Sequence, residues 1–175
     1  MIKKCYQLAP DLTICRIVNG MWQVAGGHGY IERESAIADM IRYHEAGFTS
    51  WDLADIYGPA EDFIGEFRRR LLTLKGKEEE LERIQALTKW VPQPGRITRS
   101  IVKENIERSL RRMSVSSLDL LQFHWWDYNN PYYMDALKYL SDLRDEGRIR
   151  HIGLTNFDTE RIQIMVDSDI HVVSN

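Results

Sequence analysis

Residues 118–154 read LDLLQFHWWDYNNPYYMDALKYLSDLRDEGRIRHIGL, and this stretch predicts a strand, a helix and a second strand in that order. The apolar run at 118–124 has the length of a buried strand, and 149–154 repeats that pattern. Between them, apolar side chains recur at helical spacing until Gly147, the residue type that ends a helix. Pro131 is expected at the first position of that helix, after an asparagine cap. Strand, helix and strand in succession are typical of a parallel sheet.

The same alternation runs along the whole chain. Strands are expected at 16–24, 48–53, 84–90, 118–124, 149–154 and 170–173, and helices at 32–46, from Ala60, at 98–113, from Pro131 and at 158–166. Six strands and five helices in strict alternation indicate an α/β fold with a parallel sheet and helices outside it. Both a doubly wound sheet and a (β/α)8 barrel fit this spacing, so periodicity leaves the two open.

No linker or change of composition divides the chain, so residues 1–175 are expected to form a single domain. A β-rich stretch at about 5–18, with a turn at Pro10 and Asp11, is expected to form an N-terminal hairpin. A (β/α)8 barrel takes about 250 residues. If the fold is a barrel, this chain is therefore expected to be truncated after the sixth strand.

The balance of charge excludes some classes of function. The chain has 23 Lys and Arg against 26 Asp and Glu, a net charge of −3, which is no basic footprint for nucleic acid. No apolar run approaches the roughly 18 residues of a membrane-spanning helix, and no signal peptide is evident at the start. Cys5 and Cys15 are expected to be reduced thiols of a cytoplasmic protein. A cross-strand disulfide between them is the alternative in an oxidising setting.

Polar side chains stand at the carboxyl ends of the expected strands, the edge at which parallel α/β folds bind ligands. In chain order they are Asp52, Lys89, His124, Thr155, Asn156, Ser174 and Asn175. Tyr57 lies in the loop five residues after the first of them. Because these strand ends meet at one rim, the side chains are expected to gather there.

An Asp, Tyr, Lys and His on one rim suit the transfer of a proton to a carbonyl group. A phenol is a weak acid at neutral pH, and a neighbouring ammonium such as that of Lys89 favours its ionised form. Asp52 would hold Lys89 charged and oriented, and His124 would orient the carbonyl oxygen by a hydrogen bond. The set therefore indicates reduction of a carbonyl, with hydride to carbon and the proton from Tyr57 to oxygen.

Purely structural roles for these residues compete with the catalytic interpretation. Each residue alone is more often a loop hydrogen-bond partner, and only the combination favours a functional site. One histidine and one aspartate, His124 and Asp127, are too few to bind a metal, so no metal site is expected. The glycine-rich stretch at 25–29 lacks the dinucleotide-binding fingerprint and is expected to be a loop. Trp125 and Trp126 fit either core packing or the wall of a substrate pocket. The remaining histidines are expected to be structural: His28, His44, His151 and His171.

Four segments taken together resemble the aldo-keto reductases. They are WDLADIYG at 51–58, TK at 88–89, LDLLQFHW at 118–125 and GRIRHIGLTNF at 147–157. Each segment alone is a weak indication of the family. All four together are specific, because they occur in the family's order and at fitting spacing along most of the chain.

This resemblance implies a (β/α)8 barrel of the aldo-keto reductase type, with the N-terminal hairpin plugging its bottom. It also implies NADP(H) as the cofactor and a small-molecule aldehyde or ketone as the substrate, reduced to an alcohol. The resemblance assigns Tyr57 as the general acid, Asp52 and Lys89 as the pair that tunes its acidity, and His124 as the group that orients the carbonyl. It implies that Thr155, Asn156 and Met21 contact the cofactor. Trp22 and Trp125 are then the walls of the substrate pocket.

Two alternatives compete with carbonyl reduction. The first is a non-catalytic member of the family that serves as a binding or regulatory subunit, because the family's remaining cofactor contacts would follow the sixth strand. An open barrel exposes sheet edges, so self-association or a further C-terminal segment is then expected to close it. The second is a flavodoxin-like doubly wound protein, which the set of Tyr57, Lys89 and His124 disfavours.

Overall fold

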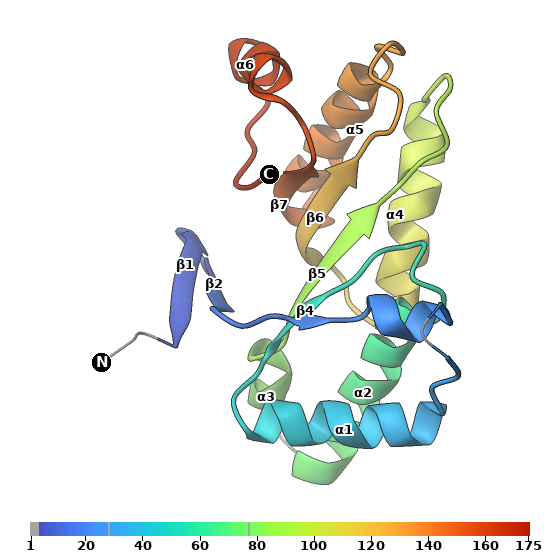
Figure 1. Cartoon of the computed structure of the whole chain (residues 1–175). Helices are drawn as coiled ribbons and strands as arrows, with labels where there is room; N and C mark the ends of the chain where they lie inside the picture. The colour runs from blue at the N-terminus through green and yellow to red at the C-terminus, as the bar shows by residue number, and fades with distance from the viewer. Residues whose placement is uncertain (1–3, 28, 77) are drawn as a thin grey trace.

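The computed structural model describes residues 4–27, 29–76 and 78–175 (Figure 1). Within these residues, the strands form an antiparallel hairpin and a parallel sheet. The hairpin consists of β1 (Cys5–Ala9) and β2 (Leu12–Cys15), and the sheet of β3 (Asn19–Gly20), β4 (Ser50–Asp52), β5 (Gln85–Trp90), β6 (Leu118–His124) and β7 (Ile149–Thr155).

Helices connect the strands of the sheet. They are the 3₁₀ helix η1 (Trp22–Ala25) and the α-helices α1 (Arg33–Glu45), α2 (Ala60–Lys75), α3 (Glu79–Glu82), α4 (Arg99–Met113), α5 (Tyr133–Asp145) and α6 (Thr159–Asp167). In Figure 1, α4 and α5 run alongside β5 and β6 on one side of the sheet. In the described ranges, no helix is long and apolar enough to cross a membrane.

The order of the strands separates the two folds that periodicity left open. The sheet has the order β3-β4-β5-β6-β7, which is also their order along the chain. A doubly wound sheet reverses its order at a switch point, whereas the strands of a β/α barrel follow one another around an arc. The expected parallel α/β fold is therefore confirmed, and the sequential order favours the barrel.

The sheet buries apolar side chains on both of its faces, which is why its longer strands read as apolar runs. On the side of the helices, Leu121 and Phe123 pack with Phe67 in the main core. On the other side, Leu120 packs in a second cluster that includes Leu12 of the hairpin. The expected N-terminal hairpin is therefore confirmed, and it covers part of the inner face of the sheet.

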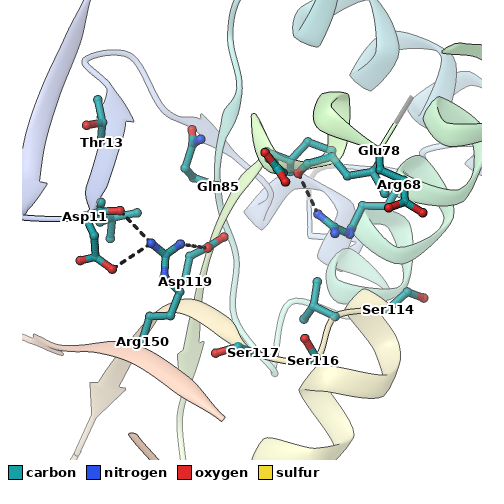
Figure 2. A pocket seen from close by; sticks show the side chains of 15 residues that line it. Asp11, Thr13, Arg68, Glu78, Gln85, Ser114, Ser116, Ser117, Asp119 and Arg150 are labelled. Carbon is teal, nitrogen blue, oxygen red and sulfur yellow. Dashed lines mark hydrogen bonds and ion pairs between the residues drawn. The ribbon is translucent and has the colours of Figure 1, made fainter. Parts of the chain in front are cut away.

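A polar cavity of about 770 Å³ opens between the hairpin and the amino ends of β5 and β6. Gln85 is the first residue of β5 and Asp119 the second of β6, and both line it together with Thr13 of the hairpin. In Figure 2, Arg68 and Arg150 lie on opposite sides of this cavity. It therefore lies at the end of the strands opposite to their carboxyl ends.

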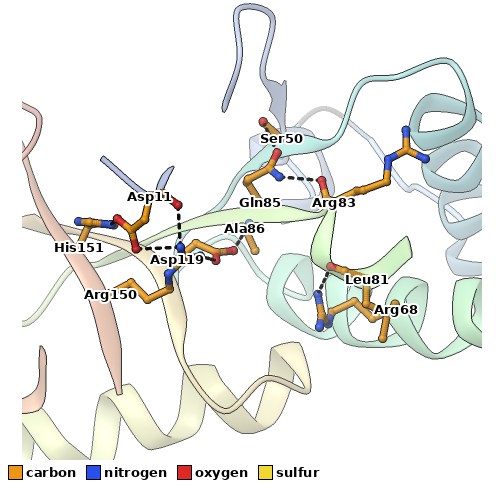
Figure 3. Close-up of polar contacts among 10 residues, drawn as sticks. All are labelled: Asp11, Ser50, Arg68, Leu81, Arg83, Gln85, Ala86, Asp119, Arg150 and His151. Carbon is orange, nitrogen blue, oxygen red and sulfur yellow. Dashed lines mark hydrogen bonds and ion pairs between the residues drawn. The ribbon is translucent and has the colours of Figure 1, made fainter. Parts of the chain in front are cut away.

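Ion pairs tie the turn of the hairpin to the amino ends of β6 and β7 (Figure 3). The Arg150 guanidinium lies 3.0 Å from an Asp11 carboxylate oxygen and 2.9 Å from one of Asp119. Nε2 of His151 lies 2.7 Å from the other oxygen of Asp11, and the second oxygen of Asp119 accepts the Ala86 N–H. Asp11 thus bonds two neighbouring residues of β7 and fixes the hairpin beneath the sheet.

The expected strand at 16–24 is wrong in extent, because only Asn19–Gly20 is a strand. The N–H of Met21 donates to the carbonyl oxygen of Asp52 at 2.9 Å, at the point where β4 ends. Beyond this bond the chain has no further β4 residue to pair with, and it turns into a 3₁₀ helix at Trp22.

The expected sixth strand at 170–173 is also wrong, because the structure assigns no strand there. The segment does run beside β7: the Val173 N–H donates to Ile152 O and the Leu154 N–H donates to Ser174 O, both at 2.9 Å. These bonds hold it on one side only, since β7 is the last strand in the described sheet.

Two smaller expectations concern the start of α5 and the remaining histidines. Pro131 is not the first residue of α5, because the helix begins two residues later, at Tyr133. His44 is buried and bonds a Glu80 carboxylate at 3.1 Å, which confirms its structural role. His171 is exposed, and His28 lies outside the described residues.

Gly65 allows α2 to pack closely against the end of α4. A Cβ added there would lie 2.1 Å from the Arg112 carbonyl oxygen, a backbone atom that cannot rotate away. We expect Gly65→Ala to lower the free energy of unfolding by about 1–3 kcal/mol, the usual cost of overpacking. Denaturant unfolding of the complete gene product measures this loss. Gly95→Ala, where a Cβ meets nothing within 4 Å, is the control, and equal stability of the two variants would contradict the prediction.

Candidate active site

The candidate site is built at the carboxyl ends of β4, β5 and β6. The parallel register pairs Asp52 with Leu87 and Lys89 with Gln122, so β5 continues past the end of β4, and β6 past the end of β5. His124 is the last residue of β6 and pairs with Thr155, the last of β7. The sequence placed these polar residues at strand ends, and the structure brings them to one rim.

Lys89 is held by three oxygen atoms. Its Nζ donates to Oδ1 and Oδ2 of Asp52 at 2.6 and 2.7 Å, and to the carbonyl oxygen of Leu53 at 2.8 Å. Only 12% of the Lys89 side chain is exposed, against 34% for Asp52. An ammonium group held by a carboxylate and a carbonyl group has a fixed position.

Tyr57 lies over this ammonium group. Nζ of Lys89 is 5.0 Å from the centre of the Tyr57 ring, within the range of a cation–π contact. The ring of Trp22 packs against the phenol edge to face, with ring centres 4.9 Å apart. The loop before α2 thus brings together the lysine and the tyrosine, which are 32 residues apart in the sequence.

His124 is half-buried on the same rim. Burial and the nearby Lys89 ammonium both lower the pKa of His124, because each disfavours a second positive charge. The imidazole is therefore neutral at pH 7, and a neutral ring carries one N–H that can donate to a carbonyl oxygen. The Trp126 ring lies against it, with ring centres 4.1 Å apart.

The end of β7 offers groups that suit an amide. The Thr155 Oγ1 is buried and has no hydrogen-bond partner in the described structure, which is costly unless a ligand supplies one. Asn156 follows in the left-handed conformation, with φ of 63°, and is exposed. A hydroxyl and a carboxamide side by side can bond both ends of a nicotinamide carboxamide, so these residues fit NADP(H).

Two of the expected site residues, Met21 and Trp125, have positions that change their assignment, whereas Trp22 lies as expected. Met21 meets the site through its main chain, bonded to Asp52, while its side chain is buried in the core. Trp22 is 48% exposed beside Tyr57, as a pocket wall requires. Trp125 is 1% exposed, and its indole N–H donates to the carbonyl oxygen of Asp127. Trp125 is therefore a core residue, and the expectation that it lines the pocket is wrong.

Trp126, which the sequence left open between core packing and a pocket wall, is 60% exposed and covers His124. One residue of the site was missed. The Gln122 side chain donates to Oδ1 of Asp52 at 3.2 Å. Side chains alternate along a strand, so the parity of β6 would have placed Gln122 on the side of His124 and Trp125 among the helices. In the described residues, no cluster of three or more His, Cys, Asp or Glu could hold a metal ion.

The fold and the rim define one class of protein, a parallel β/α barrel with Asp, Tyr, Lys and His at its carboxyl edge. The chain belongs to the aldo/keto reductase family, whose family model matches residues 16–175.

Among curated relatives, the chain is 24% identical to the NADH-specific methylglyoxal reductase of Escherichia coli (strain K12), over 87% of this chain and 52% of the relative. It is 29% identical to the methylglyoxal reductase DkgA of Salmonella typhimurium, over 89% of this chain and 53% of the relative. The chain therefore spans about half the length of the curated relatives it matches.

Solved structures agree in fold. The thermostable aldo-keto reductase Tm1743, crystallised with the inhibitor epalrestat, superposes with a TM-score of 0.78 at 22% identity, over 97% of this chain and 60% of that one. An aldo/keto reductase from Klebsiella pneumoniae in complex with NADP and acetate gives 0.74 at 24% identity, over 94% and 54%. The expected (β/α)8 barrel fold is confirmed, and this chain covers part of it.

Proposed function

We propose that this chain carries the catalytic residues of an NADPH-dependent oxidoreductase that reduces aldehydes or ketones to alcohols. One observation carries the proposal: Lys89, fixed by both oxygens of Asp52, lies 5.0 Å from the centre of the Tyr57 ring. An ammonium beside a phenol favours the charge left when the phenol gives up its proton. This arrangement makes Tyr57 the general acid.

The reduction divides between cofactor and protein. The bound nicotinamide supplies the hydride that adds to the carbonyl carbon. The neutral His124 ring donates a hydrogen bond to the carbonyl oxygen and orients it. Tyr57 transfers its proton to the same oxygen as negative charge develops there, and the Lys89 ammonium stabilises the phenolate that remains. A proton from solvent then restores the phenol.

The cofactor is proposed as NADP(H), held through its carboxamide by Thr155 and Asn156. The orphaned hydroxyl of Thr155 supports this assignment, and so do the solved aldo-keto reductases in complex with NADP or NADPH. The relative from Escherichia coli is named as NADH-specific. The binding experiment therefore includes both NADPH and NADH.

The substrate is proposed to be a small carbonyl compound. Trp22 and Trp126 flank Tyr57 and His124 with exposed aromatic surface, which suits a compact, partly apolar molecule. Two relatives are named methylglyoxal reductases, so methylglyoxal is the first compound to assay.

We also propose a cytoplasmic location, because Cys5 and Cys15 face each other across the hairpin as free cysteines.

Fluorescence titration with NADPH tests the cofactor assignment. We expect saturable binding to the complete gene product, and Thr155→Val to weaken it by roughly 2- to 13-fold, the value of one hydrogen bond. Thr73→Val is the matched control, because the exposed Thr73 hydroxyl donates to the Arg69 carbonyl oxygen within α2, away from the rim. Tighter binding of NADH would contradict the choice of NADPH. Binding without turnover of any aldehyde would favour the regulatory-subunit alternative.

A further inference from the structure

The segment after β4 stays paired with β5 beyond the end of the strand. The Leu53 N–H donates to Leu87 O at 3.0 Å, and the Asp55 N–H donates to Lys89 O at 2.9 Å. The Asp55 carboxylate then accepts the Val91 N–H at 3.2 Å. Asp55 therefore bonds the main chain on both sides of Trp90, the last residue of β5, directly after Lys89.

A buried acid supports this clamp from behind. Glu61, in the first turn of α2, is 1% exposed, and its carboxylate accepts the Thr88 hydroxyl at 2.8 Å. Its other oxygen lies 3.5 Å from Nη1 of Arg112 on α4. The same Nη1 donates to the carbonyl oxygen of Asp55 at 3.4 Å. Glu61 and Arg112 thus join α2, α4 and β5 behind the loop that carries the tyrosine.

The position of Tyr57 depends on this loop. Tyr57 follows Asp55 by two residues, and its N–H closes a turn onto the Ala54 carbonyl oxygen at 3.1 Å. The main chain from Ala54 to Tyr57 is therefore anchored to β5 at Asp55. Beside the longer bond from Arg112 to the Asp55 carbonyl oxygen and the packing of Trp22 on the phenol, the bonds of Asp55 to residues 89 and 91 fix this loop relative to Lys89.

We propose that Asp55 is a positioning residue for carbonyl reduction, whose carboxyl group clamps the Tyr57 loop to β5 and so keeps the phenol beside Lys89. The inference rests on the proposed function and adds a residue that acts through Tyr57 rather than on the substrate. A misplacement of about 1 Å at a reacting group costs on the order of 100-fold in rate.

The charge of Asp55 is not what the clamp requires. Burial and the neighbouring Glu61 carboxylate raise the pKa of Asp55 to about 6, against the opposing effects of the Val91 N–H hydrogen bond and of Arg108 on α4. The neutral carboxyl group keeps a carbonyl oxygen, which accepts the Val91 N–H as the carboxylate does. Asparagine offers the same acceptor and leaves no charge to bury, so Asp55→Asn is expected to preserve the clamp.

Kinetics of two variants in the complete gene product test the inference, with methylglyoxal and NADPH as substrates. We expect Asp55→Ala to lower kcat on the order of 10- to 100-fold with little change in KM. Asp55→Asn should retain kcat within about 3-fold, so that the variant which keeps the acceptor rescues the loss. Asp145→Ala, which removes an exposed ion pair with Arg144, is the control.

An unchanged kcat in Asp55→Ala, or a change confined to KM, would overturn the inference. If Asp55→Ala does not fold, Asp55→Glu takes its place, since the longer side chain keeps the charge but pushes the loop off Val91. Equal rates for Asp55→Glu and Asp55→Asn would then overturn it. Tyr57→Phe is assayed in parallel: if it keeps full turnover, the proposed function itself fails, whereas its inactivity beside an active Asp55→Ala rejects only the role of Asp55.

Discussion

Tyr57→Phe is expected to lower the turnover of methylglyoxal by the complete gene product by about 10²- to 10⁴-fold, the contribution of a general acid, and to leave the dissociation constant of NADPH unchanged. The phenyl ring keeps the edge-to-face contact with Trp22 and the face presented to Lys89. Only the hydroxyl group is lost, so the variant separates proton transfer from packing. Initial rates of NADPH oxidation and a fluorescence titration give the two quantities.

Tyr43→Phe is the matched control for this variant. Tyr43 is 51% exposed on α1 and lies against Trp51, on the side of the sheet away from the rim. It should turn over at the wild-type rate. If Tyr57→Phe does so as well, Tyr57 is not the general acid, and the mechanism proposed for the rim is wrong.

The strands that the sequence predicted best are those buried on both faces. β6 (Leu118–His124) has the expected bounds, and β7 extends the expected 149–154 by one residue. Both pair along their length with a neighbour and pack under helices, so each carries several buried apolar side chains that can be recognised locally.

The ends of the sheet could not be predicted in the same way. β3 has two residues and the segment at 170–173 has none in a strand, although both stretches are rich in β-branched or apolar residues. How far each pairs depends on the length of the strand beside it, which is a tertiary property. A local sequence pattern indicates β propensity, but it does not show whether a neighbouring strand is there to pair with the segment.

In the candidate site too, some residues could be predicted from the local sequence and others depend on tertiary contacts. Asp52, Lys89 and His124 could be predicted because each ends a strand that the sequence marks clearly. Trp125 and Trp126 could have been told apart by strand parity, since His124 faces the rim and the next side chain faces the helices. Asp55 could not have been found, because its role depends on meeting the Val91 N–H, which is 36 residues away.

Lys89→Met tests the centre of the site. Methionine keeps the length of the side chain and removes the ammonium group that bonds Asp52 twice and Leu53 once. We expect turnover of methylglyoxal to fall by about 10²- to 10⁴-fold, as for loss of the general acid itself, because the phenolate loses its stabilising charge. The free energy of unfolding should fall by about 1–3 kcal/mol, since the Asp52 carboxylate and the Leu53 carbonyl lose their partner.

The double variant Asp52→Asn with Lys89→Met separates these two effects. It removes the charge that Lys89→Met leaves uncompensated, so stability measured by denaturant unfolding should recover while turnover stays low. Lys138→Met, an exposed lysine on α5, serves as the control for both assays. Recovery of turnover together with stability would mean that Lys89 acts only by filling its place beside Asp52, and the charge over the Tyr57 ring would then carry no part of the reaction.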